Sequence, residues 1–241
     1  MELAVPARPA ASAPLAPAAA AAAQRADLYT PIHKALRAFM SATLHDVGRM
    51  DAADDAEVAA ALAQTRSLLE LCQGHLEKEN AFVHPAMDAR QPGWAARTAA
   101  EHVGHEQSIR ELAAAVDAVA AATGAARAAA ALRLYRHLAL FVGENFEHMH
   151  SEETAGNALL WATHTDAELL AIHGALLASI KPPEMAVAMR WMIPALNHAE
   201  RVAMLRGMRQ GAPAPVFEGV LRIAREHLAP RDWDKLVAAL A

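Results

Sequence analysis

Two copies of a His-x-x-x-Glu pattern constrain this chain more than any other feature of its sequence. The first is His75 with Glu79 in HLEKE, and the second is His148 with Glu152 in HMHSE. Residues four apart lie one above the other on the same face of an α-helix, so the two side chains of each pair would project together. Both pairs continue stripes of apolar residues, which indicates that they are buried. Because a buried carboxylate is costly without a compensating charge, the pattern favours a metal ion.

Four long segments carry apolar residues in steps of three and four, which is typical of amphipathic helices. We predict helices over about residues 30–49, 57–87, 96–122 and 126–156. Thr30 is a good N-cap with Pro31 at the first helical position, and the Asp-rich turn 51–55 caps the next helix. Gln91-Pro92-Gly93 breaks the chain before the third. Short connections between long helices predict an all-α fold, an up-down-up-down antiparallel four-helix bundle.

The rest of the chain divides on either side of this predicted bundle, which we place at residues 27–158. Residues 1–26 are rich in alanine and proline, and we expect them to form a disordered leader. Residues 159–241 contain two capping-box patterns, Thr165 with Glu168 and Asn197 with Glu200. Shorter helices rich in Met, Leu and Trp follow, so we expect a helical C-terminal extension whose apolar faces pack together.

Composition narrows the classes of function. The formal net charge is −5, from 27 acidic and 22 basic residues, and no Lys/Arg cluster appears. Nucleic acid and anionic membrane are therefore not expected as partners. The single cysteine, Cys72, excludes a disulfide within the chain and fits a reducing compartment. The N-terminal stretch has no basic region of the kind that begins a secretory signal, so we expect a cytoplasmic protein.

The chain also contains an internal repeat. His33 precedes His75 by 42 residues, and His105 precedes His148 by 43. Each half has the form His, long gap, His-x-x-x-Glu. In the first half, about 16 residues up one helix and 18 down the next correspond to about 24 and 27 Å at 1.5 Å per residue, so the two histidines arrive at similar depth. Stacked halves would place four histidines and two glutamates around one point.

At these positions the chain resembles the hemerythrin-like, cation-binding HHE family over about residues 28–156. His33, His75 with Glu79, a histidine of the third helix, and His148 with Glu152 match the family's motif. The resemblance implies a four-helix bundle that holds a non-haem di-iron centre, with both glutamates bridging. Iron also suits a His/carboxylate site with open positions, while zinc and manganese are alternatives.

The histidine of the third helix has two candidates. His102 and His105 both lie on the predicted inward face, and the repeat spacing favours His105. Binding by both would close one coordination position. Oxygen-carrying hemerythrins have a His-x-x-x-His pair on this helix, whereas here Glu106 follows His102 by four residues. Because this chain lacks that pair, we do not expect it to store oxygen. The complete set of predicted metal ligands is His33, His75, Glu79, His102, His105, His148 and Glu152.

Other notable residues have simpler interpretations. We expect His84 at the boundary of the bundle, His137 at its core or end, and His45 and His150 off the ligand stripe. Cys72 is expected to be a small buried hydrophobe. Tyr29 is expected to cap one end of the bundle. Glutamates that flank the ligands could accept hydrogen bonds from imidazole N–H groups; they are Glu77, Glu101, Glu106 and Glu153.

The function expected from these residues is binding or sensing of oxygen, nitric oxide or peroxide at a di-iron centre, with the C-terminal helices relaying the state or docking a protein partner. Iron-centre repair or detoxification of oxidants and nitric oxide is an enzyme-like alternative, and a metal-free helical scaffold is a third. No partner cysteine, flavin motif or nucleotide motif is visible, which favours sensing or binding over catalysis.

Overall fold

The computed structural model describes residues 25–241, and this part of the chain is all helical, with no β-strand. Most of the predicted leader, residues 1–24, lies outside the described residues. Its last two residues belong to the fold: the Arg25 guanidinium and the Ala26 backbone N–H both donate to the Asp166 carboxylate, at 2.7 and 3.2 Å. Arg25 and Ala26, which we placed in the leader, are therefore hydrogen-bonded to the described fold.

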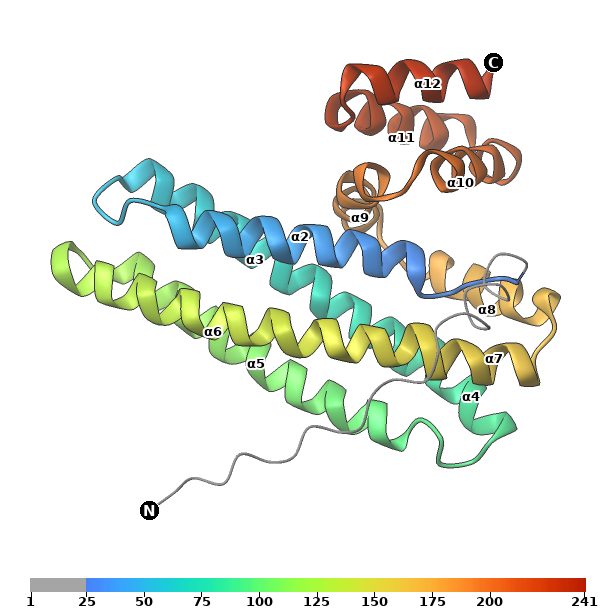
Figure 1. Ribbon diagram of the computed structural model, residues 1–241, viewed down its shortest axis with the longest axis horizontal. Coiled ribbons are helices and arrows are strands. Elements are labelled where there is room, and N and C mark those ends of the chain that lie inside the picture. Colours follow the sequence, from blue (N-terminus) through green and yellow to red (C-terminus); the bar gives the residue numbers. More distant parts are fainter. Residues whose placement is uncertain (1–24) are drawn as a thin grey trace.

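The longest helices of the described chain lie side by side (Figure 1). They are α2 (Thr30–Arg49), α3 (Asp55–Lys78), α5 (Ala96–Ala121) and α6 (Gly124–Ser151). Helix α2 contacts α3 and α6, and α5 contacts the same two helices. The apolar stripes read from the sequence meet in one core between them, which includes Leu36, Leu69, Leu112 and Leu138.

The ends of these helices follow from local chemistry, with one correction. Asp54 accepts hydrogen bonds from the N–H groups of Ala56 and Glu57 and so caps α3 as expected. Helix α2 begins at Thr30, but Thr30 does not cap it. Asp27 does, because its Oδ1 accepts from the N–H groups of Tyr29 and Thr30 at 2.9 and 3.0 Å.

Helices α3 and α6 each continue through a five-residue π-helical segment. Segment η1 (Glu79–Val83) links α3 to α4 (His84–Arg90), and η2 (Glu152–Gly156) links α6 to α7 (Asn157–Thr163). A π-helical turn holds one extra residue, which shifts the helix face beyond it relative to the face before it. Helix α7 also carries the fourth long helical run past residue 158, so the predicted boundary of the bundle falls inside a helix.

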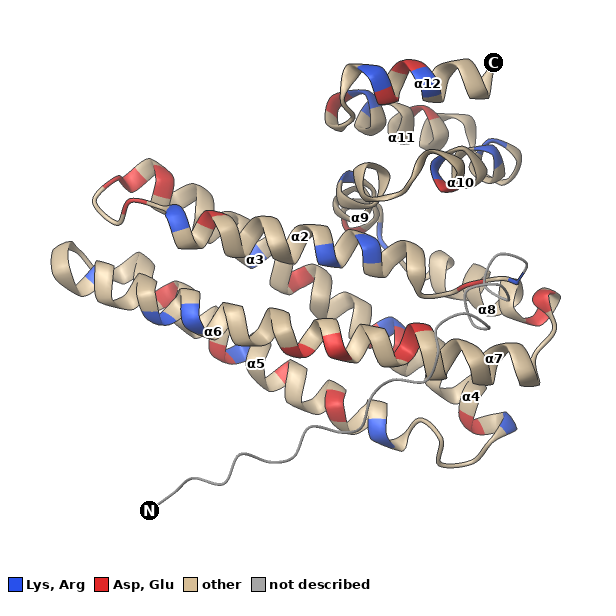
Figure 2. Ribbon diagram, in the orientation of Figure 1, with Lys and Arg blue, Asp and Glu red and all other residues tan. Residues whose placement is uncertain are grey.

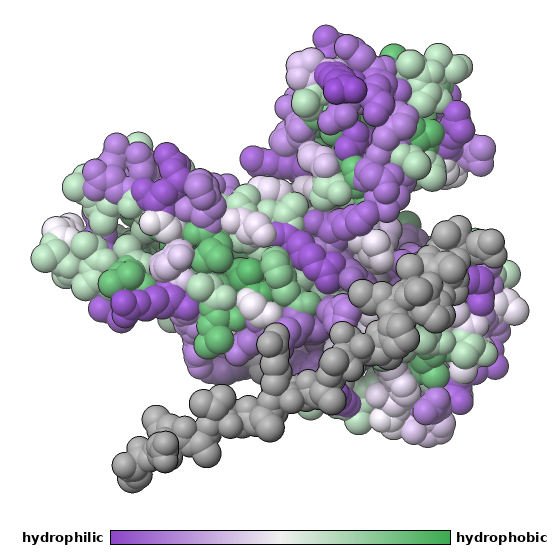
Figure 3. Space-filling model, in the orientation of Figure 1, coloured by the Kyte–Doolittle hydropathy of each residue, from purple (hydrophilic) through white to green (hydrophobic). Residues whose placement is uncertain are grey.

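The C-terminal region folds into shorter helices: the first packs with Tyr29, Val83 and Met87, and the other four form a core of their own. They are α8 (Asp166–Ala178), α9 (Pro182–Ala195), α10 (His198–Gly211), α11 (Ala214–His227) and α12 (Pro230–Leu240). The two predicted capping boxes are present at α8 and α10. Helices α9 to α12 bury a cluster that includes Met189, Ile193, Leu205 and Leu236. Their outer face in Figure 3 is mostly hydrophilic, which fits a small domain with an internal core.

Helix α9 joins this region to the long helices through α2. The rings of Phe39 on α2 and Trp191 on α9 stack with centroids 4.1 Å apart. Lys34, the neighbour of His33, donates to both oxygens of Glu200 on α10 at 2.6 and 2.8 Å. One face of α2 therefore packs on the C-terminal helices while another face carries His33 into the core.

Acidic and basic residues are distributed along most of the described helices (Figure 2). Among the described residues, no helix combines the length and the apolar content needed to cross a membrane.

Candidate metal centre

Six of the predicted ligands come together in two groups that share both glutamates. The first group is His33, His75, Glu79 and Glu152, and the second is Glu79, His102, His148 and Glu152. Within each group the ligand atoms lie within 4.8 Å of one another. His33 comes from α2, His75 from α3, His102 from α5 and His148 from α6. One histidine per long helix, as the sequence predicts, thus reaches a common point in the core.

The two oxygens of each glutamate face different groups. Oε1 of Glu79 lies 3.3 Å from His75 Nε2, whereas its Oε2 lies 3.5 Å from His102 Nε2. Oε2 of Glu152 lies 3.5 Å from His33 Nε2, whereas its Oε1 lies 3.3 Å from His148 Nε2. Each carboxylate therefore spans the space between one pair of imidazoles and the other. This is the arrangement required of a carboxylate that bridges two cations.

Both glutamates occupy the first position of a π-helical segment. In each case the histidine four residues earlier is still in the preceding α-helix. The extra residue after the glutamate lets the chain continue into a helix whose buried face has a different direction. The two halves of the sequence repeat thus share a local irregularity exactly where the carboxylates enter the core.

The carboxylate oxygens and imidazole nitrogens of the two groups are suited to bind a metal ion, because most of them have no hydrogen-bond partner in the protein. Both carboxylate oxygens of Glu79 and Glu152 are buried and accept no hydrogen bond, and His33 Nε2 and His75 Nε2 are also buried without a partner. Buried polar atoms are nearly always hydrogen-bonded, so such a concentration requires an explanation. His102 Nε2 and His148 Nε2 face each other at 3.0 Å. Two nitrogen ligands about 2.1 Å from one ion stand at about this separation.

Two of the imidazoles are oriented by carboxylates on their other side. His33 Nδ1 donates to Glu153 at 3.1 Å, and His148 Nδ1 donates to Glu101 at 2.9 Å. Arg37 pairs with Glu153, and Arg97 pairs with Glu101 at 2.9 Å. Because a carboxylate only accepts, Nδ1 carries the proton and Nε2 is the nitrogen left to bind a metal. Glu101 and Glu153 were among the flanking glutamates expected in this role.

His102 is oriented by a residue that the sequence analysis missed. Its Nδ1 donates to the side-chain oxygen of Asn80 at 2.8 Å. Asn80 directly follows Glu79, as Glu153 directly follows Glu152. In both halves, therefore, the residue after the motif glutamate holds a histidine from the other half. The repeat itself was the signal that could have found Asn80.

The carboxylates govern how the imidazoles titrate in the metal-free protein. Burial disfavours the charged form of His33, but the neighbouring carboxylates of Glu153 and Glu79 outweigh burial and raise the pKa of His33 to about 9. Burial also disfavours the charged form of His148. The carboxylates of Glu152 and Glu101 outweigh burial and raise the pKa of His148 to about 8. Burial dominates at His75 and lowers its pKa to about 4. The pKa of Glu152 is held far below its ordinary value, because the nearby imidazoles of His102 and His148 outweigh the cost of burial.

The structure distinguishes between the two histidines of the third long helix. His102 belongs to the second group, whereas His105 belongs to neither. The repeat spacing pointed to His105 because it assumed equal helix pairs. Helix α2 extends 16 residues beyond His33, but α5 extends 19 residues beyond His102, and α6 is likewise longer than α3 before its motif histidine. From its candidate histidine to the connecting loop, each helix of the second pair is about one turn longer than its counterpart in the first pair. The histidine of α5 at the same depth as His148 is therefore His102, one turn before His105.

His105 nevertheless lies next to the centre. It is buried, and its ring centroid is 4.7 Å from that of His148. Burial and the neighbouring His148 and His102 lower its pKa to about 4.

His84 departs from its expected boundary position. It is buried at the start of α4, and its ring stacks on that of His102 at 4.8 Å. The π-helical turn before it explains the difference, since the shifted face points His84 inward. Tyr29 is buried with Val83, Met87 and Leu160 in an apolar cluster beside the long helices, and its ring lies 5.4 Å from that of His33.

The other expectations agree with the structure. His45 and His150 are exposed. His137 is half-buried and pairs with Glu111 at 3.6 Å, away from the centre. Cys72 is buried in the core, and burial raises the pKa of its thiol to about 12.

Comparison with known proteins adds no relative. A scan of protein-family models finds no match to this chain, and searches of curated proteins and of solved structures find none either. The resemblance to the hemerythrin-like family therefore rests on the motif residues themselves.

Proposed function

We propose that this protein is a non-haem di-iron protein of hemerythrin-like type, whose four long helices form an antiparallel bundle around the metals. The observation that carries the proposal is the division of each glutamate's two oxygens between two pairs of imidazoles. In this proposal Glu79 and Glu152 would hold one iron together with His33 and His75, and the other together with His102 and His148. His/carboxylate donors with room for a further ligand suit ferrous iron.

A metal-free scaffold is the less favoured alternative. It would leave four carboxylate oxygens buried without hydrogen bonds. A buried polar group without a partner costs about 1–3 kcal/mol, and a charged group costs more. Two bound cations would supply partners for all of them.

We propose that the centre binds or senses oxygen, nitric oxide or peroxide. A pair of ferrous ions supplies the electrons and open positions for such ligands. The chain's own residues orient the imidazoles through Glu101, Glu153 and Asn80 and bury the two glutamates of the centre. A sensing role is supported by α2, which carries His33 to the centre and packs on α9 through the Phe39–Trp191 stack. A change at His33 would thus reach the C-terminal helices through one rigid element.

A thiol-dependent turnover is less favoured. Cys72 is buried and its pKa is about 12, so the thiol stays protonated near neutral pH and is a poor nucleophile or reductant.

Anaerobic reconstitution of the full chain with ferrous iron tests the proposal. We expect two irons per chain, and on exposure to air an optical spectrum with oxo-bridged di-ferric bands. His75→Ala should lower the stoichiometry, whereas His45→Ala, on an exposed position of α2, should not. Fewer than one iron per chain, unchanged by His75→Ala, would refute the di-iron centre. Rapid catalytic consumption of peroxide by the reduced protein would favour detoxification over sensing.

A further inference from the structure

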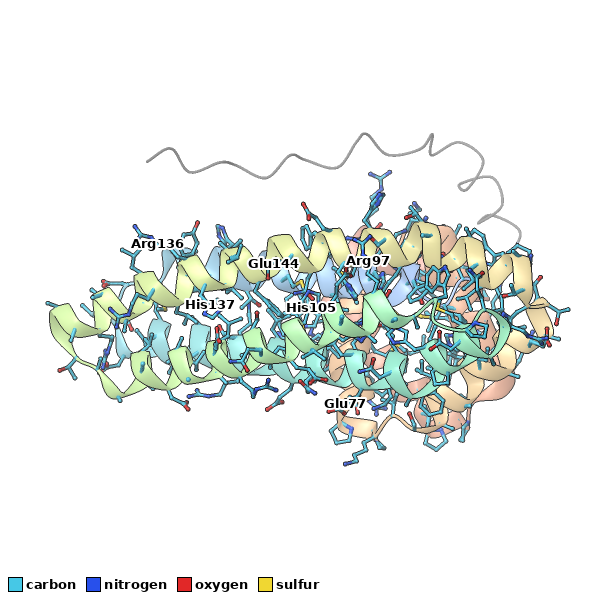
Figure 4. All side chains as sticks on the ribbon, turned by 90° about the horizontal axis from the view of Figure 1, so that it is seen from below. Glu77, Arg97, His105, Arg136, His137 and Glu144 are labelled. Atoms are coloured by element: carbon cyan, nitrogen blue, oxygen red, sulfur yellow. The ribbon has the colours of Figure 1, made fainter. Side chains whose placement is uncertain are left out.

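A groove between α5 and α6 leads from the surface to the second group of candidate ligands. It has a volume of about 780 Å³, and both His105 and His148 line it. His148 belongs to the second group, so the groove extends to one candidate ligand of the centre. Figure 4 shows His105 between these two helices, with Arg97 and Glu144 nearby and His137 farther along α6.

The charges that line this groove favour a cation. Glu101, Glu144 and Glu147 contribute three carboxylates, against the guanidinium of Arg97. That guanidinium is already paired with Glu101 at 2.9 Å. Glu144 and Glu147 are exposed on α6, where their charge acts on ions that approach from solvent. A cleft lined by one sign of charge raises the local concentration of counter-ions and their rate of entry.

His105 provides an independent sign of a ligand in this groove. Its side chain is buried, with 6% of the residue exposed, and its Nδ1 has no hydrogen-bond partner. A neutral imidazole offers one nitrogen lone pair, which is a good ligand for divalent transition metals. His105 nevertheless lies outside both groups of candidate centre ligands. It is therefore a buried imidazole beside the centre with a nitrogen that has no partner within the protein.

A row of imidazoles connects the groove to the centre. The ring centroid of His105 is 4.7 Å from that of His148, and the ring centroid of His148 is 4.9 Å from that of His102. An ion held at His105 would find its next imidazole ligand, His148, on the neighbouring ring. Neighbouring ligands at such spacing allow a cation to change partners without passing through a dry, uncharged region.

We infer that this groove is the entry site for divalent metal ions, and that His105 is a transient ligand that passes them to His148 and the centre. This inference rests on the proposed metal centre and adds a route by which the metals reach it. It assigns His105 a role in the rate of metal loading and none in the final coordination.

The test follows Co²⁺ uptake by the metal-free full chain in a stopped-flow spectrophotometer. We expect the wild type to bind two Co²⁺, and His105→Gln to reach the same stoichiometry roughly tenfold more slowly. His137→Gln is the matched control, because His137 is a half-buried histidine of α6 that pairs with Glu111. It should load at the wild-type rate. The double variant Glu144→Gln, Glu147→Gln should load slowly, with a weaker dependence of the rate on salt.

Each outcome has a defined meaning. Wild-type kinetics in His105→Gln would overturn the inference and leave the metal centre intact. Binding of only one Co²⁺ by His105→Gln would also overturn it, because His105 would then be a permanent ligand. Wild-type protein that binds no metal would instead refute the proposed function. If far-UV circular dichroism shows that His105→Gln does not fold, the glutamate double variant decides, and an unchanged rate with unchanged salt dependence overturns the inference.

Discussion

Glu79 and Glu152 each begin a π-helical segment. In each residue one carboxylate oxygen faces the imidazoles of His33 and His75, and the other faces those of His102 and His148. The two residues are related by the internal repeat of the sequence, and the structure brings them to the same point in the core. A pair of bridging carboxylates related in this way should make equal contributions to holding two ions.

This equivalence predicts the effect of removing either negative charge. Glu79→Gln and Glu152→Gln should each lower metal binding from two ions per chain to one or fewer, because a neutral amide cannot bridge two cations. Metal analysis after reconstitution measures the stoichiometry. Glu77→Gln is the matched control, since Glu77 is exposed on the same helix and accepts a hydrogen bond from Gln73. Full binding of two ions by both core variants would contradict the bridging role.

The carboxylates behind the imidazoles should tune affinity without changing stoichiometry. Glu101→Gln and Glu153→Gln weaken the acceptors of His148 Nδ1 and His33 Nδ1. Loss of such partners costs about 10- to 100-fold in metal affinity. Competition with a chelator of known affinity measures the loss, with Glu111→Gln, in the ion pair with His137, as the control. A drop to one ion per chain would instead make these glutamates ligands.

Stability of the metal-free protein should pass through a maximum near pH 6.5 and decline on both sides of it. The folded-state pKa values of His33 and His148, about 9 and about 8, lie above the ordinary 6.5. Their contribution is complete below pH 6.5 and is lost as the pH rises through 8 to 9. The pKa of His75, about 4, lies below 6.5, so its contribution is lost as the pH falls from 6.5 toward 4.

Urea denaturation across this pH range, with chelator or with bound metal, measures the effect. The alkaline decline should be absent from the metal-loaded protein, because metal ions replace the protons on these imidazoles. Loading at pH 7 should also release protons from His33 and His148. A metal-free protein that is more stable at pH 9.5 than at pH 7 would show that the carboxylates do not hold protons on these histidines.

The Phe39–Trp191 stack should hold the C-terminal helices on α2. Trp191→Ala removes a half-buried ring from this contact and should lower the free energy of unfolding by about 2 kcal/mol, from lost burial and lost ring stacking. Two metals should still bind. Chemical denaturation measures the stability and metal analysis measures the binding. Trp233→Ala is the control, because Trp233 packs only against the C-terminal cluster and its loss reports on the core of that region instead of the contact with α2. Loss of metal binding in Trp191→Ala would mean that α9 supports the centre directly.

Much of the helical structure follows from the residues in order. The stripe of His33, Leu36 and Met40 is buried as its spacing predicts, and the capping boxes at Thr165 and Asn197 form as written. These patterns depend on neighbours within one or two turns. Helix starts were less certain, because Asp27 takes the capping role that Thr30 was expected to have. Both residues are good caps, and local pattern does not rank them.

The His-x-x-x-Glu pairs were determined by the sequence alone, because the spacing of four on a helix and the apolar stripe beside it leave few places for these side chains to go. The tertiary structure decided what meets across the core. It placed His102, and not His105, in a group of candidate ligands, because the second pair of long helices extends further than the first. It turned His84 inward through a π-helical turn, and it brought Asn80 to His102. These outcomes depend on the relative lengths and rotations of separate helices, which no short-range pattern encodes.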